Sequence, residues 1–150
     1  MFGVLGNHDW WLDGPRVSAA LASAGITMLE DSALAVADGR LWLAGVSDYR
    51  EGAHDVARAL RDVPGDAPTI VFTHNPDVFP DVPARVTLTV AGHTHGGQVD
   101  LPLIGPPVVP SRYGRRYAEG HVIEDGRHLF VSPGTGTSIL PARVFIRGRG

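Results

Sequence analysis

The stretch TIVFTHNPD, residues Thr69–Asp77, carries a β-rich apolar run directly into a histidine. The same arrangement recurs on either side of it. RVTLTVA at Arg85–Ala91 leads into GHTHGG, and the short apolar MFGVL at the start of the chain leads into GNHD. In layered α/β folds, sites form where strands end along one edge of a sheet, so we expect the polar residues after these three runs to lie together.

The remaining patterns predict helices and turns around these strands. Asp13-Gly14-Pro15 predicts the start of a helix that ends at Gly25, and Ala53–Arg61 predicts a second helix. Asp38-Gly39 and Asp125-Gly126 each separate two β-rich runs, which predicts two hairpins. The order of elements indicates an α/β (α+β) fold, a layered β-sandwich with mixed sheets flanked by helices, in one domain over residues 1–150 with a frayed tail over about 142–150.

The composition excludes several classes of function. The chain has no cysteine, which excludes disulfides, thiolate metal sites and cysteine nucleophiles. Its formal charge of −3 provides no basic field, so we expect no nucleic acid as a stable partner. No apolar run approaches the length of about 18 residues that spans a bilayer, and no signal peptide is visible. We therefore expect no transmembrane segment in this chain and a cytoplasmic location.

GHTHGG is the most specific local pattern. In an extended segment, residues two apart point the same way, so His93 and His95 would face one cavity while Thr94 faces away. Neutral imidazole is the commonest protein ligand for a transition metal. The alternative is a pair of surface histidines in a glycine-rich turn.

The three polar runs carry more information together than separately. Alone, His74 fits a hydrogen-bonded histidine at a strand end, and Asn and Asp in GNHD fit a turn. Combined, they predict a nitrogen- and oxygen-rich set without thiolate, which suits Mn, Fe, Zn, Co or Ni. Its members are Asn7, His74, His93 and His95.

In their order along the chain, GNHD, TH and GHTHGG resemble the motifs of the calcineurin-like metallophosphoesterases. The wider stretches LGNHDWW, LWLAGVSDY, FTHNPDVFP and AGHTHGGQVDLPLIGPPVVPSRYGRRY are similar to a bacterial branch related to UDP-diacylglucosamine pyrophosphatases. The resemblance covers Gly3 to about Pro141. It implies two layers of sheet flanked by helices, and hydrolysis of a phosphomonoester, phosphodiester or pyrophosphate bond with two divalent metals at the sheet edge.

The resemblance also implies roles for individual residues. Asn7, His74 and His93 would bind one metal, and His95 the other. His8 would be catalytic, meeting a phosphoryl oxygen or protonating the leaving group, with Asp9 orienting it. Two metals can clamp an in-line displacement, and a positioned histidine can supply a proton, so these roles are chemically consistent.

The chain departs from the family pattern at both ends. The family has an earlier Asp-x-His and an earlier Gly-Asp, whose carboxylate bridges the metals, and Asp9, Asp13 and Asp31 do not stand in those patterns. Pro141–Gly150 lacks the usual apolar closing strand. We therefore expect the later part of a longer enzyme, through a late start assignment, a broken gene or a genuine truncation. An anchor in the missing part would associate the protein with a membrane.

The missing carboxylate has an electrostatic consequence. Two doubly charged ions about 4 Å apart repel by roughly 4 kcal/mol even in water, so we expect this chain to hold one metal rather than two. Missing strands would leave an unpaired sheet edge, through which the chain would dimerise or aggregate. Two alternatives to a phosphoesterase stay open: a non-catalytic remnant that binds one metal or a partner, and a histidine-rich structural domain without metal.

The apolar, proline-rich segment Leu101–Gly114 predicts a long loop, and loops of this length are usually functional. Arg112, Arg115 and Arg116 accompany it and suit phosphate recognition. One reading is a pocket for a phosphorylated small molecule or a lipid-like substrate. The other is a surface loop packed by its own prolines.

Overall fold

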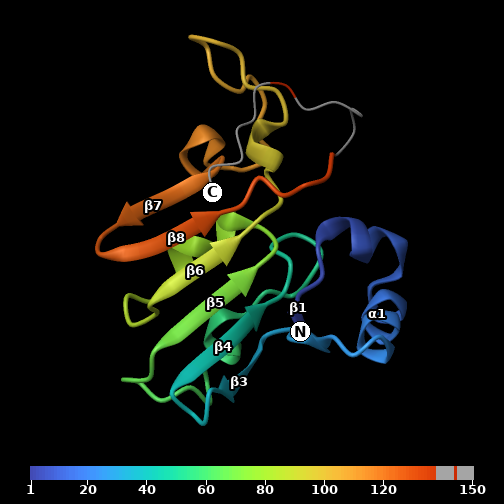
Figure 1. The fold of residues 1–150 in the computed structure, drawn as a ribbon, viewed down its shortest axis with the longest axis vertical. Helices are drawn as coiled ribbons and strands as arrows, with labels where there is room; N and C mark the ends of the chain where they lie inside the picture. The colour runs from blue at the N-terminus through green and yellow to red at the C-terminus, as the bar shows by residue number, and fades with distance from the viewer. Residues whose placement is uncertain (138–143, 145–150) are drawn as a thin grey trace.

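The computed structural model describes residues 1–137 and Val144, and its main feature is a six-stranded mixed sheet in the order β3-β4-β5-β6-β8-β7 (Figure 1). Among the four central strands the three pairings β4–β5, β5–β6 and β6–β8 are parallel, and an antiparallel hairpin strand closes the sheet at each edge. The strands are β3 (Ser32–Val36), β4 (Leu41–Val46), β5 (Thr69–Thr73), β6 (Leu88–Ala91), β7 (Gly120–Glu124) and β8 (Arg127–Val131).

Two further layers accompany this sheet. A two-stranded parallel sheet is formed by β1 (Phe2–Gly3) and β2 (Thr27–Met28), with the long helix α1 (Asn7–Ser23) between them in sequence. The shorter helices are α2 (Val56–Ala59), η1 (Pro76–Asp81), η2 (His95–Gly97) and η3 (Gly114–Tyr117). The predicted mixed α/β fold is confirmed, in a form consistent with a metallophosphoesterase-like α/β sandwich.

Both predicted hairpins are confirmed. Asp38 and Gly39 join β3 to β4 with φ of 57° and 82°, and Asp125 and Gly126 join β7 to β8 with φ of 50° and 74°. Asp and Gly tolerate this left-handed region better than other residues, which is why the dipeptide marks the turn.

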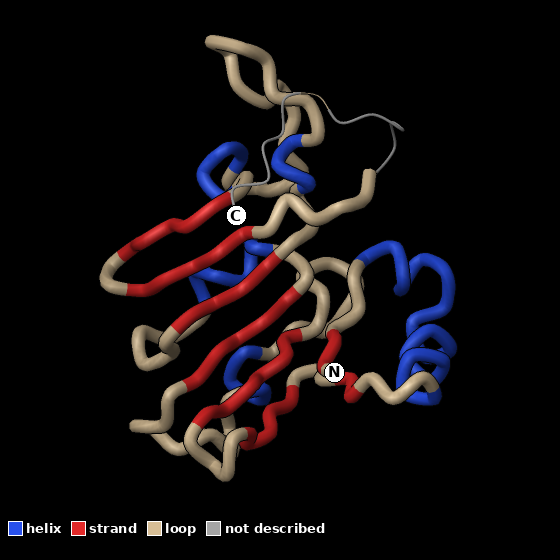
Figure 2. The backbone as a smooth tube through the Cα atoms, in the orientation of Figure 1, coloured by secondary structure: helices blue, strands red, loops and turns tan. Residues whose placement is uncertain are grey.

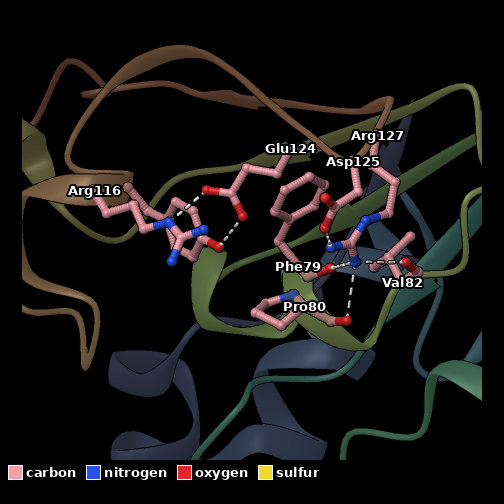
Figure 3. A network of polar contacts seen from close by, with 8 residues as sticks. Phe79, Pro80, Val82, Arg116, Glu124, Asp125 and Arg127 are labelled. Carbon is pink, nitrogen blue, oxygen red and sulfur yellow. Dashed lines mark hydrogen bonds and ion pairs between the residues drawn. The ribbon is translucent and has the colours of Figure 1, made fainter.

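The main core lies between the sheet and the helices α2 and η1, which cover one face (Figure 1). Val71 of β5 and Leu129 of β8 are fully buried there against Phe79 of η1. Arg127 secures the same contact: its Nη1 donates to the carbonyl oxygens of Pro80 at 3.0 Å and Val82 at 3.2 Å (Figure 3). The end of η1 is thereby tied to the sheet.

The opposite face of the sheet is apolar as well. Ile70 and Phe72 alternate with the core residues of β5 and are half-buried. At β4 this face meets the β1–β2 layer so closely that a Cβ on Gly45 would lie 2.3 Å from the Leu29 carbonyl oxygen and 2.9 Å from Val4 Cγ1. Strands with two apolar faces read as continuous hydrophobic runs, which accounts for TIVFT and LWLAGV.

The first helix differs from its prediction. GNHD does not end a strand: α1 begins at Asn7, because Asp9 Oδ2 accepts a hydrogen bond from Gly6 N at 2.8 Å and closes the first turn. The predicted start at Asp13 coincides with a kink inside α1. Asp13 is non-helical at φ 172° and ψ 87°, and its Oδ1 accepts from Arg16 N at 3.2 Å, so it begins the second part of the helix.

Other boundaries are shorter than predicted. The second helix spans only Val56–Ala59 of the predicted Ala53–Arg61, whereas Thr69–Thr73 forms its strand as predicted. The predicted loop Leu101–Gly114 is irregular and folds back on itself at an isolated Leu101–Gly105 bridge. The predicted tail falls outside the described residues except for Val144, which forms a bridge with Val99. Among the described helices, none has the length and apolar character that crossing a bilayer requires.

Candidate metal centre

Loops and the start of α1 lie near the carboxyl ends of β5 and β6 (Figure 2). A cavity of about 410 Å³ is lined there by residues of these segments. Its lining includes all six residues that the sequence predicted for the site, together with five others. The predicted residues are Asn7, His8, Asp9, His74, His93 and His95, and the others include Trp11, Arg50, Pro110 and Thr137.

Three of the predicted ligands form a tight cluster within this cavity. His74 Nε2 lies 2.9 Å from Asn7 Oδ1 and 3.0 Å from His93 Nδ1. The two imidazole rings are nearly perpendicular, at 71° with centroids 4.8 Å apart. His95 faces the same cavity, so the chain brings His74, His93 and His95 together rather than scattering them as a purely structural histidine-rich domain would.

The fold fixes His74 from both sides. Its carbonyl oxygen accepts from Gly92 N at 3.0 Å, which holds the end of β5 against the loop after β6. Its ring packs on the backbone of Gly6, where a Cβ would lie 2.8 Å from ring atoms Cε1 and Nδ1. Asn75, the next residue, caps η1 by accepting from Asp77 N at 2.9 Å. Glycine at position 6 is therefore a packing requirement of this histidine.

The GHTHGG segment reaches the predicted orientation by a different backbone. It is not extended: His93 and His95 have φ of 68° and 51°, and a 3₁₀ turn follows. Thr94 does face away, because it is buried and its Oγ1 donates to the Ala118 carbonyl at 2.6 Å. Positive φ at non-glycine residues is strained, and such strain is concentrated at functional sites.

Burial makes both histidines of the cluster poor bases. The pKa of His74 is lowered to about 4, chiefly by burial and secondly by the charge that His93 can carry. The pKa of His93 is lowered too, chiefly by burial, while Asp48 acts in the opposite direction. Both rings are therefore neutral near pH 7, and neutral imidazole is the form that binds metals.

The hydrogen-bonding of the cluster is incomplete without a cation. His74 Nε2 faces both Asn7 Oδ1 and His93 Nδ1, and a single ring nitrogen cannot make a full hydrogen bond to each. If His74 Nε2 carries a proton, that proton is shared between two acceptors, Asn7 Oδ1 and His93 Nδ1. If Nε2 carries no proton, its lone pair faces the lone pairs of the Asn7 oxygen. Two ligands about 2.1 Å from one metal and at right angles lie about 3.0 Å apart, close to the spacing seen here.

His95 adds to this picture. Its Nδ1 is buried and has no hydrogen-bond partner among the described residues. A buried polar atom without a partner is costly and calls for an explanation, such as an ion. The donor set therefore fits a divalent transition metal.

Three donors converge at one point of this cavity, and one of them is an amide oxygen. Within residues 1–137, no group of three or more His, Cys, Asp or Glu side chains is arranged to hold a metal ion. The cluster reaches three donors only through the amide oxygen of Asn7. What the described chain assembles is a single site of one oxygen and two nitrogen donors, with His95 beside it.

The two predicted catalytic residues lie at the mouth of the cavity. His8 is exposed in the first turn of α1, and its ring lies 4.7 Å from that of Trp11. Trp11 is 64% exposed and donates from Nε1 to Glu51 at 3.0 Å, which places it at the rim rather than in the core. Asp9 holds the Gly6 amide, as described above, and its action on His8 stays a prediction.

Sequence reasoning missed two charged residues of this site. Asp48 is 1% exposed, its Oδ2 has no hydrogen-bond partner in the described chain, and it raises the pKa of both cluster histidines. Arg50 lines the cavity. The available signal was their position: both follow β4, whose carboxyl end lies beside that of β5.

The arginines predicted near the long loop are used within the protein. Arg115 donates to the carbonyl oxygens of Pro106 at 2.9 Å and Ile104 at 2.5 Å. Arg116 pairs with Glu124 at 2.5 Å (Figure 3), and Arg112 contacts Tyr49. The loop contributes Pro110 to the cavity, whereas the arginine that lines it is Arg50.

Comparisons with known proteins agree with the predicted resemblance. No protein-family model and no solved structure matches the chain. It is 35% identical over 151 residues to the "uncharacterized metallophosphoesterase YkuE" of Bacillus subtilis, an alignment that covers 96% of this chain and 52% of that protein. It is 33% identical over 144 residues to the "phosphodiesterase YaeI" of Escherichia coli, covering 91% of this chain and 51% of that one.

A more distant relative has a membrane part. The chain is 28% identical over 159 residues to a "transmembrane protein with metallophosphoesterase domain" of Danio rerio, covering 95% of this chain and 35% of that protein. The chain spans about half the length of the first two relatives it matches.

Proposed function

Because this chain belongs to the calcineurin-like metallophosphoesterase superfamily, a hydrolase family, we propose that its cavity is part of a metal-dependent phosphoesterase centre. In this proposal Asn7, His74 and His93 hold one divalent metal. The observation that carries it is the convergence of one amide oxygen and two neutral ring nitrogens at 2.9 and 3.0 Å. The chemistry of these donors suits Mn, Fe, Zn, Co or Ni.

The surrounding residues have distinct tasks in this proposal. When bound, a divalent metal polarises a phosphoryl oxygen and activates water. Arg50 binds the other phosphoryl oxygens, because a guanidinium presents paired donors to them. His8, exposed at the mouth, donates a proton to the departing oxygen, the role for which histidine is used most often.

Two buried groups complete the site. Asp48 places a carboxylate near both histidines, and its negative charge offsets that of a cation in the cluster. His95 turns a ring toward the cavity and, as the family resemblance implies, would serve a second metal. The substrate that fits this arrangement is a phosphorylated small molecule, bound in the cavity whose lining includes Trp11 and Pro110.

The test is hydrolysis of bis(p-nitrophenyl) phosphate with and without Mn²⁺, by the chain and by any longer protein that contains it. We expect Mn²⁺-dependent turnover that His74→Ala abolishes. His121→Ala is the matched control, because His121 lies on the far hairpin. Turnover that survives His74→Ala would contradict the assignment.

A non-catalytic protein that binds one metal is the second candidate, and the single three-donor cluster favours it. It predicts Mn²⁺ binding near one ion per chain without hydrolysis by any form of the protein. A ratio near two would exclude this alternative, and absence of binding would contradict both.

A further inference from the structure

The long loop carries a concentration of exposed apolar side chains that the proposed chemistry does not use. Leu101, Leu103, Ile104 and Val108 are all exposed, and Leu103 is 108% exposed. The loop, gold in Figure 1, projects beyond the end of the sheet. A single exposed aliphatic side chain is ordinary, but several together indicate an interaction surface.

A tight turn holds the tip of the loop in this position. Gly105 N donates to the Leu101 carbonyl oxygen at 2.7 Å, and Ile104 N donates to the same oxygen at 3.2 Å. Leu103 lies within this turn at φ 70°, a strained conformation for a residue other than glycine. Because its side chain is fully exposed, no packing within the chain compensates this strain.

The backbone of the tip needs little water. Residues 101–110 include four prolines, which have no N–H to satisfy. Arg115 donates to the carbonyl oxygens of Ile104 at 2.5 Å and Pro106 at 2.9 Å. A segment that enters the apolar part of a bilayer must satisfy its backbone polar groups internally, and these features serve that requirement.

The base of the loop is fixed to the body of the protein. Asp77, buried in η1, accepts from Ser111 Oγ at 2.5 Å and from Arg112 N at 2.9 Å. Pro106 packs so closely on Gly97 that no room is left there for a Cβ. The apolar tip is therefore presented from an anchored support.

Positive charge accompanies the apolar tip. Residues 101–117 contain three arginines and no Asp or Glu, in a chain with a formal charge of −3. Arg116 pairs with Glu124, whereas Arg112 and Arg115 form no ion pair within residues 1–137. Their printed partners are a tyrosine hydroxyl and carbonyl oxygens, which are neutral. Two uncompensated cations thus stand behind an apolar tip.

We propose that this tip, formed by Leu103, Ile104 and Val108, inserts into the surface of an anionic lipid bilayer, with Arg112 and Arg115 at the lipid phosphates. Apolar side chains gain when they leave water, and arginines beside an anionic membrane add electrostatic attraction. An apolar groove on a protein would accept the aliphatic side chains but would give the arginines no counter-charge. The bilayer suits both parts of the loop, and its binding requires no metal.

Cosedimentation of the whole chain with vesicles tests this proposal. The vesicles contain phosphatidylcholine, with or without an equal amount of phosphatidylglycerol, and we expect binding to the mixed vesicles. Ile104→Ser should weaken this binding by about tenfold or more, because one aliphatic side chain no longer leaves water. Ile123→Ser is the matched control: Ile123 is also 60% exposed but lies on the edge strand β7, and its substitution should change nothing.

A second pair of variants separates insertion from adsorption by charge. Leu103→Ser should weaken binding at least as much as Ile104→Ser, and it should fold normally because the leucine is fully exposed. Arg112→Gln should weaken binding to the mixed vesicles by about fivefold, the contribution of one arginine near an anionic surface. If Arg112→Gln weakens binding while neither apolar substitution does, the tip does not insert and the proposal is wrong.

Three further outcomes would overturn the proposal. The first is that the chain binds neither kind of vesicle. The second is that Ile123→Ser loses as much binding as Ile104→Ser. The third is self-association without lipid that Leu103→Ser abolishes in a chain that ignores vesicles, measured by sedimentation equilibrium. That result would make the tip a contact between two copies of the chain.

Discussion

Two pairs of histidines in this protein have almost the same spacing and opposite surroundings. His74 and His93 face each other with nitrogens 3.0 Å apart, and His121 and His128, on the β7–β8 hairpin, do so at 2.9 Å. The first pair meets edge to face at 71° and lines a cavity together with Asn7. The second is stacked at 19° on the open surface of the hairpin.

The comparison shows that proximity of imidazoles does not make a metal site by itself. The cavity pair has a third donor, a lowered pKa, a buried carboxylate nearby and a strained backbone. The hairpin pair follows from strand register: the pairing of Ile123 with His128 places His121 diagonally across from His128 on one face. Burial and additional donors distinguish the two.

The largest expected effect comes from removing a ligand. His93→Ala should reduce Mn²⁺ affinity more than 100-fold, because two donors remain where three converged. His121→Ala should leave it unchanged. Calorimetric titration of both variants measures the difference, and equal losses would remove the distinction between the pairs.

A second effect concerns stability as a function of pH. His74 has a pKa of about 4 in the folded chain, below its unfolded value of 6.5, so the unfolded state binds more protons between these values. The stabilisation is complete above about pH 6.5 and is lost as the pH falls toward 4. It amounts to at most about 3 kcal/mol, at 1.36 kcal/mol per pH unit of separation.

Urea denaturation of the metal-free chain at several pH values tests this prediction. His74→Gln should flatten the decline of unfolding free energy between pH 6.5 and 4, and His121→Gln should not. A decline of equal size in both variants would show that burial of His74 is not its source.

A third effect concerns the packing of His74. Gly6→Ala places a Cβ 2.8 Å from the His74 ring, and the ring must move. We expect about a tenfold loss of Mn²⁺ affinity, comparable to that of other changes behind a ligand. Gly65→Ala is the control because a Cβ there meets nothing within 4 Å. Unchanged affinity in Gly6→Ala would mean that the ring position is not critical.

The smallest effect concerns substrate rather than metal. Arg50→Ala should raise KM for bis(p-nitrophenyl) phosphate by roughly tenfold, since a hydrogen bond to a charged group contributes about 1.5–3 kcal/mol. Mn²⁺ affinity should not change, and neither should either constant in Arg61→Ala, whose side chain is exposed. If Arg50→Ala does not change KM, Arg50 does not bind the substrate.

Local patterns predicted the elements whose cause is local. The Asp-Gly turns and the run Thr69–Thr73 formed as predicted because turn chemistry and strand propensity act over a few residues. The predicted start of the first helix, at Asp13, was wrong. The sequence GNHD also fits the end of a strand, but the Asp9 side chain closes a helical turn by accepting from Gly6 N. The grouping of His74 and His93 was predictable from the positions where β5 and β6 end, whereas Asn7 joins them from the first turn of α1.

Other parts of the site depend on contacts between distant segments. Asp48 enters through the neighbouring ends of β4 and β5, and Pro110 through a loop that Asp77 holds at Ser111, 34 residues further along the chain. No local pattern contains these pairings. Thr94, next to the strained His93, is likewise hydrogen-bonded to Ala118, which lies 24 residues further along the chain.

The most direct test is anomalous diffraction from crystals of this protein soaked in MnCl₂. The account predicts one strong peak between Asn7 Oδ1, His74 Nε2 and His93 Nδ1, and none at His121 and His128. Density at the hairpin pair with none in the cavity would contradict it.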